Sequence, residues 1–209
     1  MNSVDTLTCL AFSPDGQKIA SSTAHSGVTI TDIALKSKCQ LDDAHARTIT
    51  AIAWSPDSEN IMGTSIDHKI HCWNATSLHP LGLPLAGHKD LIITAEFLSV
   101  SSQAISLSRD GELLIWNTGN GKITQTETVS NSNGTIFIGA LSMDGTLLVT
   151  TDGRKGVAWE IPTCMKIAEI ELPDTPSLQT AIFPHNDQSS SACIWRRVFL
   201  YVGRIHWET

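Results

Sequence analysis

The sequence has few cysteines, and their spacing excludes two classes of small stabilised domain. Cys9, Cys39, Cys72, Cys164 and Cys193 form an odd, scattered set without a Cys-x-x-Cys pair. A disulfide framework needs an even set of cysteines, and a zinc knuckle needs closely spaced ones. We therefore expect reduced cysteines on half-buried strands, in a protein of the cytoplasm or the nucleus.

Positive charge and long apolar runs are also scarce. Lys and Arg number 14 against 21 Asp and Glu, which gives a net charge of -7, whereas binding to a nucleic-acid backbone requires a basic face. No stretch approaches the roughly 18 apolar residues of a membrane-spanning helix, and the first residues lack the pattern of a secretory signal. The sequence predicts a soluble protein that binds neither nucleic acid nor membrane.

What the sequence does contain is a repeat of about 42 residues. The segment Ser13-Pro14-Asp15-Gly16 recurs 42 positions later as Ser55-Pro56-Asp57-Ser58. An apolar residue before this segment recurs at Phe12, Trp54, Phe97 and Leu141. A second column keeps the same period at Thr31-Asp32, Trp73-Asn74, Trp116-Asn117 and Trp159-Glu160. Two independent columns with one period indicate a repeat architecture.

Each unit consists of short runs of alternating or β-branched residues, such as residues 7–12, 18–22 and 28–32, separated by turn residues. Four short strands in about 42 residues is the size of one propeller blade. We predict an all-β propeller of four-stranded antiparallel blades, about five units in one domain. The expected blades cover residues 1–42, 43–85, 86–128, 129–172 and 173–209, the last one degenerate.

Two of these units resemble the WD-repeat family. Ala44-His45 followed by Trp73-Asn74, and Gly87-His88 followed by Trp116-Asn117, are similar to its Gly-His to Trp-Asp frame. An aspartate stands six residues before each tryptophan and a serine eight before, as in that family. The phrases Ser13-Pro-Asp-Gly16 and Trp116-Asn-Thr-Gly119 are similar to repeat arrays of fungal and bacterial signalling proteins.

The resemblance implies buried hydrogen-bonded tetrads, in which aspartate orients histidine, histidine meets serine, and serine accepts the tryptophan indole N–H. A buried indole needs such a partner because it can only donate. The expected tetrads are His45, Ser65, Asp67 and Trp73, and His88, Ser108, Asp110 and Trp116. A partial set in the fourth unit consists of Thr151, Asp152 and Trp159.

Other chemistry for these residue types is less favoured. Histidine, serine and aspartate also make up a hydrolase triad, but a second full copy favours architecture. His68 and His71 stand three apart, and on a strand such residues point to opposite faces, so we expect no metal ion. No phosphate-binding loop or other cofactor motif is present. The expected innermost strands carry Glu96 as their only acid, which disfavours a propeller-hosted enzyme.

The predicted function is a non-catalytic scaffold for protein–protein interaction, with partners docked on the propeller face and rim loops. The resemblance implies contact residues beside the histidine and aspartate columns: Arg47, His68, Lys89, Asp90, Arg109 and Arg154. An alternative is a regulatory or sensor repeat segment of a larger signalling protein. A propeller-hosted enzyme is a third and less favoured interpretation.

Closure of the ring is the open question at the level of sequence. Propellers close with between about four and eight blades, so five units could just form a ring. The family usually closes with more, and we expect an incomplete or open arc. Open blade edges are templates for association, so self-association is predicted. Its expected site is the apolar run through Trp195, Phe199, Tyr201 and Trp207.

Overall fold

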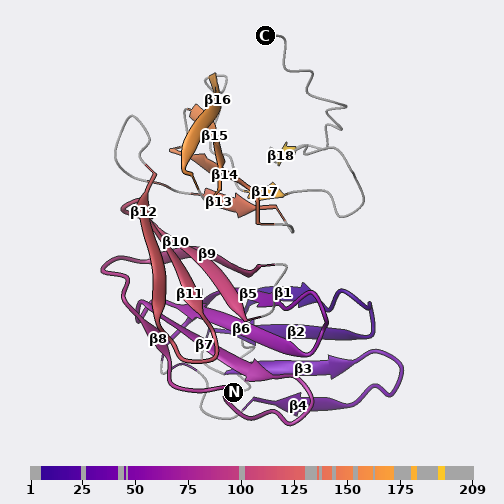
Figure 1. Cartoon of the computed structure of the whole chain (residues 1–209). Coiled ribbons are helices and arrows are strands. Elements are labelled where there is room, and N and C mark those ends of the chain that lie inside the picture. Colours follow the sequence, from indigo (N-terminus) through magenta and orange to yellow (C-terminus); the bar gives the residue numbers. More distant parts are fainter. Residues whose placement is uncertain are drawn as a thin grey trace.

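The chain folds as a series of small antiparallel β-sheets (Figure 1). The computed structural model describes His45, Ile136 and residues 6–24, 27–41, 47–98, 102–129, 138–142, 145–152, 155–161, 163–171, 180–182 and 193–195. Within these residues the backbone forms strands and turns but no α-helix, and so no helix that could cross a membrane. The prediction of an all-β fold is confirmed.

Four of the sheets have four strands each, and in each of them the spatial order follows the order along the chain. Blade 1 contains β1 (Leu7–Phe12), β2 (Lys18–Thr23), β3 (Val28–Asp32) and β4 (Lys38–Gln40). Blade 2 contains β5 (Ile49–Trp54), β6 (Asn60–Ser65), β7 (Lys69–Asn74) and β8 (Leu85–Ala86).

The next two sheets repeat this order. Blade 3 contains β9 (Ile92–Phe97), β10 (Gln103–Ser108), β11 (Glu112–Asn117) and β12 (Ile123–Thr128). Blade 4 contains β13 (Ile138–Leu141), β14 (Leu147–Thr151), β15 (Lys155–Glu160) and β16 (Met165–Glu171). A fifth, two-stranded sheet pairs β17 (Thr180–Ile182) with β18 (Cys193–Trp195).

The repeated Ser-Pro-Asp segment forms the turn between the first two strands of a blade. In blade 1 the Ser13 hydroxyl donates to Asp15 Oδ1 at 2.6 Å and accepts from the Lys18 amide at 2.9 Å. The Ser55 hydroxyl makes the equivalent bonds in blade 2, to Asp57 at 2.5 Å and from the Asn60 amide at 2.8 Å. Short polar side chains of this kind satisfy turn amides, which explains why the segment recurs.

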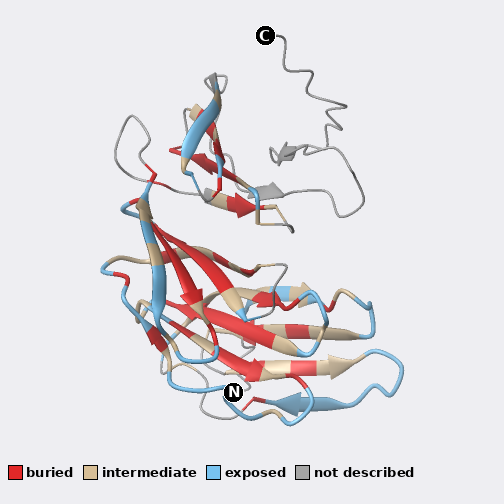
Figure 2. Ribbon diagram, in the orientation of Figure 1, coloured by how far each residue is buried: buried red, intermediate tan, exposed pale blue. Residues whose placement is uncertain are grey.

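The blades bury their apolar faces against one another. The first strands β1, β5, β9 and β13 contact each other in that order, and β17 contacts β13. The second and third strands are the most buried, whereas β4 and β12 are largely exposed (Figure 2). One apolar cluster lies at each junction between described blades, so a blade is stabilised mainly by its neighbours.

Several expectations concern parts of the chain that are not described. The side chain of Trp195 and the residues Phe199, Tyr201 and Trp207 lie outside the described residues. The blade boundaries, the single domain and the closure of the ring therefore remain predictions.

Candidate functional site

Most of the predicted site residues that the structure describes lie at one end of the sheets, which we call the entry end, whereas the tryptophans lie toward the other end of their strands. It is formed by the loops that lead into the first strands and by the turns between the second and third strands, as in residues 47–48, 66–68, 87–91 and 109–111. Backbone hydrogen bonds join loop to turn within blades 2 and 3. The Ile66 amide donates to Thr48 O at 3.1 Å, and the Arg109 amide donates to Leu91 O at 2.8 Å.

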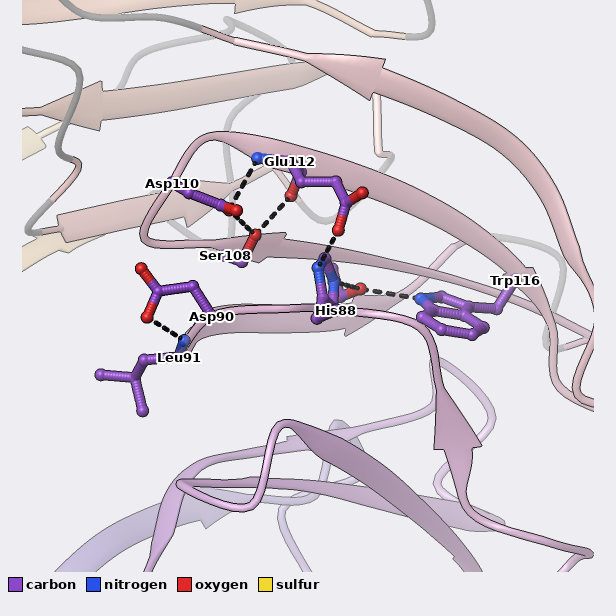
Figure 3. A network of polar contacts seen from close by, with 8 residues as sticks. His88, Asp90, Leu91, Ser108, Asp110, Glu112 and Trp116 are labelled. Carbon is purple, nitrogen blue, oxygen red and sulfur yellow. Dashed lines mark hydrogen bonds and ion pairs between the residues drawn. The ribbon is translucent and has the colours of Figure 1, made fainter.

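A buried chain of hydrogen bonds holds the entry end of blade 3 (Figure 3). The Trp116 indole Nε1 donates to Ser106 Oγ at 2.7 Å, and Ser106 Oγ lies 2.6 Å from His88 Nε2. His88 Nδ1 lies 3.2 Å from the Glu112 carboxylate. Because a carboxylate only accepts, Nδ1 donates to Glu112 and Nε2 accepts from the Ser106 hydroxyl. Burial lowers the pKa of His88, although Glu112 opposes the shift, which favours this neutral form.

Two members of the blade 3 tetrad differ from the prediction. The bridging serine is Ser106, where Ser108 was expected, and the acid beside His88 is Glu112, where Asp110 was expected. The strand register explains the first difference, since Ala104 pairs with Trp116 and Ser106 follows two residues later on the same face. Ser108 lies a further two residues along, out of reach of the indole.

Ser108 and Asp110 instead hold the turn between β10 and β11. The Ser108 hydroxyl donates to Asp110 Oδ1 at 2.5 Å, and the Glu112 amide donates to the same carboxylate oxygen at 3.3 Å. In this position Asp110 accepts from turn groups and does not contact the histidine directly. The two residues therefore stabilise the turn that carries Arg109 to the surface.

Blade 2 has a related but incomplete arrangement. His45 Nδ1 lies 3.2 Å from Asp67 Oδ2, so the predicted aspartate and histidine are brought together. His45 Nε2, however, lies 2.8 Å from the carbonyl oxygen of Gly63 and does not reach Ser65. Gly63 occupies the position equivalent to Ser106, because Ile61 pairs with Trp73. The Ser65 hydroxyl accepts the Asp67 amide at 3.3 Å within the turn.

A third ring, that of His71, packs beside His45 and Trp73 in blade 2. His71 pairs with Gly63 in the strand register, and its ring centroid lies 4.2 Å from that of His45 and 5.7 Å from that of Trp73. A Cβ atom at Gly63 would lie 3.2 Å from the Trp73 ring, so the glycine makes room for this packing. In the described part of the chain no three histidine, cysteine or acidic side chains are placed to hold a metal ion.

In blade 4 the indole of Trp159 is again satisfied by a hydroxyl. Its Nε1 donates to Thr150 Oγ1 at 2.8 Å, where Thr151 had been expected. Leu148 pairs with Trp159, so Thr150 holds the same register position as Ser106 in blade 3. The buried Asp152 accepts the Lys155 amide at 2.8 Å. The sequence analysis did not predict Ser106 or Thr150 as acceptors of the indole N–H. Their positions ten and nine residues before their tryptophans are the signal that could have found them.

Five of the six predicted contact residues lie at the entry end, where Arg109 is exposed and His68 and Asp90 are half-buried. Arg47 and Lys89 are exposed, and His68 sits in a turn with a positive φ of 65°. Arg109 and Asp90 form a two-point ion pair, with Nε to Oδ2 at 3.3 Å and Nη2 to Oδ1 at 3.1 Å. The Leu91 amide and then Arg109 lower the pKa of Asp90. The last predicted contact, Arg154, lies outside the described residues.

The buried networks leave little scope for catalysis. His88, Ser106 and Glu112 have the composition of a catalytic triad, but Ser106 is fully buried and its oxygen accepts the Trp116 indole. A nucleophile needs access to a substrate and a free trajectory of attack. The remaining acid singled out earlier, Glu96 on β9, makes no ion pair with a described residue, and burial raises its pKa to about 7.

Comparison with known proteins gives both sequence and structural matches. The family description "WD domain, G-beta repeat" matches residues 2–34 and 35–74. Protein tipD of Dictyostelium discoideum is 26% identical over 132 residues, which are 63% of this chain and 21% of tipD. COMPASS component SWD3 of Saccharomyces cerevisiae is 31% identical over 120 residues, 57% of this chain and 37% of SWD3. The chain thus spans well under half the length of these relatives.

Solved structures share the fold at low sequence identity. The structure of U3-55K superimposes with a TM-score of 0.67 at 21% identity, over 80% of this chain and 52% of that one. The crystal structure of RRP9 WD40 repeats gives a TM-score of 0.66 at 20% identity, with the same coverage. These similarities agree with the expected blade architecture.

Proposed function

We propose that this chain, which is similar to the WD-repeat family over residues 2–34 and 35–74 and shares the β-propeller fold of its solved neighbours, is a non-catalytic platform that docks other proteins on its entry end. The observation that carries the proposal is the clamp of blade 3, in which Trp116, Ser106 and His88 anchor the loop that presents Lys89 and Asp90. A loop fixed in this way loses little conformational freedom on binding, which favours affinity.

The exposed side chains around the clamp supply the contact chemistry. Arg47 and Lys89 make no ion pair with any described residue, so their charges remain free to meet a partner. Arg109 stays about half exposed despite its pair with Asp90. Arginine is enriched at protein interfaces because its fork can bond to carboxylates and carbonyls at once. We therefore assign the docking surface to the entry end of blades 2 and 3.

A regulatory role within a larger signalling protein is a second candidate. It is favoured by the share of each relative that the chain matches, 21% of tipD and 37% of SWD3. SWD3 is named as a component of COMPASS. For this chain we propose only that its partners are proteins. We propose that the chain is located in the cytoplasm, with the nucleus as the alternative.

Site-specific photo-crosslinking in cells tests the docking surface. A photoreactive amino acid at position 89 or 47 is expected to give protein adducts, since both side chains are exposed at the entry end. The matched control is position 122, an exposed lysine in the turn between β11 and β12 at the opposite end of the same sheet. Equal adduct yields from both ends, or adducts only from position 122, would overturn the assignment.

A further inference from the structure

The two histidine clamps differ in the groups that face the imidazole ring. In blade 3, His88 lies between a hydroxyl, which can donate or accept, and a carboxylate, which only accepts (Figure 3). One ring proton, on Nδ1, satisfies both contacts. In blade 2, His45 Nδ1 lies 3.2 Å from Asp67 Oδ2, and Nε2 lies 2.8 Å from the carbonyl oxygen of Gly63. Both of these groups only accept, so the His45 ring needs a proton on each nitrogen.

No neutral form of the ring satisfies both contacts of His45. Turning the ring over would place carbon atoms against the two oxygens. A ring with a single proton would leave one nitrogen lone pair facing an oxygen lone pair. The His45 side chain is fully buried, where an unsatisfied polar contact of this kind is costly. The blade 2 clamp therefore holds one proton more than the blade 3 clamp.

The additional proton lies on the imidazole and not on the carboxyl. Burial acts to raise the pKa of Asp67, but the hydrogen bond and the charge of His45 outweigh burial and lower the pKa below its usual 3.8. The carboxylate also accepts the Lys69 amide at 3.0 Å, which favours its anionic form. The contact between His45 and Asp67 is therefore an ion pair.

A second imidazole packs against the ring, that of His71 on β7. The two ring centroids lie 4.2 Å apart, so two imidazolium ions at these positions would repel each other. We assign the single positive charge to His45, because its two nitrogens face the carboxylate and the carbonyl. The titratable groups that the described elements place against His45 are thus Asp67 from the turn between β6 and β7 and His71 from β7.

We propose that His45 is an imidazolium ion in the folded chain and that its second proton makes the blade 2 clamp dependent on pH. The ring ties the loop before β5 to Asp67 in the turn and to Gly63 on β6. As the pH rises and the second proton leaves, one of these bonds is lost, and the loop that presents Arg47 is held less firmly. His88 needs one proton only and loses no bond in this direction.

The acid side of the clamp depends on Asp67. Protonation of this carboxyl removes the ion pair, and it occurs as the pH falls through a pKa that lies below 3.8. The clamp is therefore intact between this acid limit and the pH at which His45 loses its second proton. The consequence for docking at Arg47 rests on the proposed function, whereas the charge of His45 does not.

Nitrogen-15 NMR of the imidazole rings in the whole chain measures the charge. At neutral pH, His45 is expected to show a proton on both ring nitrogens, whereas His88 shows one on Nδ1 alone. Asp67→Asn is expected to return His45 to one ring proton, because an asparagine amide can donate to Nδ1. The matched control is Glu112→Gln in blade 3. It should leave one proton on His88, since a glutamine carbonyl still accepts from Nδ1.

Amide hydrogen exchange measures the effect on the loop. The Ile66 amide donates to Thr48 O in blade 2, and the Arg109 amide donates to Leu91 O at the equivalent place in blade 3. The protection of Ile66 relative to Arg109 is expected to fall about tenfold when His45 loses its second proton, the effect of about one hydrogen bond. This ratio removes the direct effect of pH on exchange, and in Asp67→Asn it should stay constant.

Each of three results would contradict the proposal. One ring proton on both His45 and His88 at neutral pH would show that the two clamps have the same charge. Two protons on His45 in Asp67→Asn as well as in wild type would show that the carboxylate does not hold the charge. A protection ratio that is constant with pH in wild type would show that the charge does not anchor the loop. Crosslinking at positions 47 and 89 is read separately from all three, so the two proposals fail independently.

Discussion

At the scale of single residues, the indole partners are the most direct test of the blade clamps. Ser106→Ala removes the acceptor of a fully buried tryptophan and the donor to His88. We expect it to lower the free energy of unfolding by about 1–3 kcal/mol, the cost of leaving buried polar groups unpaired. Urea unfolding followed by tryptophan fluorescence measures this change.

The fourth blade provides the control for that substitution. There a threonine, Thr150, accepts the equivalent indole, so Ser106→Thr should retain most of the stability that Ser106→Ala loses. Thr126→Ala on the exposed strand β12 should change stability little. Equal midpoints for Ser106→Ala and wild type would refute the bridging role.

Glu96 makes the stability of the folded chain depend on pH. Burial raises its pKa from 4.5 to about 7, so the folded chain favours the neutral carboxyl. Its contribution to stability is full below about pH 4.5 and is lost as the pH rises through about 7. Because the side chain keeps some contact with solvent, the loss is about 3 kcal/mol at most.

Glu96→Gln keeps the shape of the side chain and removes the titration. The stability of this variant relative to wild type is expected to rise between pH 4.5 and pH 7 and then to level off. Thermal melting of both chains across this range measures the difference, and other titrating groups cancel in the comparison. A difference that does not vary with pH would show that the carboxyl is not buried in solution.

At the scale of elements, the turn between β10 and β11 depends on a glycine. Gly111 has a positive φ of 89°, and a Cβ atom there would lie 2.1 Å from the carbonyl oxygen of Val129. Gly16, in the turn between β1 and β2, has a similar φ of 70° but nothing within 4 Å. Substitution of these two glycines therefore separates the effect of backbone strain from the effect of steric overlap.

We therefore expect Gly111→Ala to destabilise the chain more than Gly16→Ala. The strain at Gly16 costs about 1 kcal/mol, whereas Gly111→Ala also forces the backbone of Val129 to move and should cost about 3 kcal/mol or more. Urea midpoints of the two variants give the comparison. Similar losses in both would mean that the contact with Val129 relaxes freely.

The elements also show how far sequence alone leads. The period-2 runs at residues 7–12 and 28–32 predicted β1 and β3 because alternation and turn residues are local signals. The tetrad serine was misplaced because Ser106 and Ser108 face the same side of β10 and both fit the spacing to Trp116. Only the pairing of Ala104 with Trp116 distinguishes them, and register is a property of two strands.

Some members of the buried networks cannot be recognised from the local sequence. Glu112 reaches His88 across 24 positions in sequence, and the His71 ring packs on His45 in the blade where Gly63 holds the position of Ser106. Both depend on how loops and strands pack in three dimensions. Residue type indicated a clamp in blades 2 and 3 and part of one in blade 4, but the identity of the members required the fold.

At the scale of the whole molecule, the blades differ in how firmly they are held. Blades 2, 3 and 4 each bury a tryptophan, Trp73, Trp116 and Trp159, whereas the same column in blade 1 holds the half-buried Thr31. Blade 1 also exposes one side of its first strand and all of β4. Since a blade is stabilised by its neighbours, we expect blade 1 to open first.

Hydrogen exchange on the wild-type chain measures this difference between the blades. Amides paired between β2 and β3 should exchange at least about tenfold faster than those between β10 and β11, which lie between two neighbouring blades. Uniform protection of both pairs would mean that the blades unfold as one cooperative unit, and that the exposed side of β1 carries no penalty in stability.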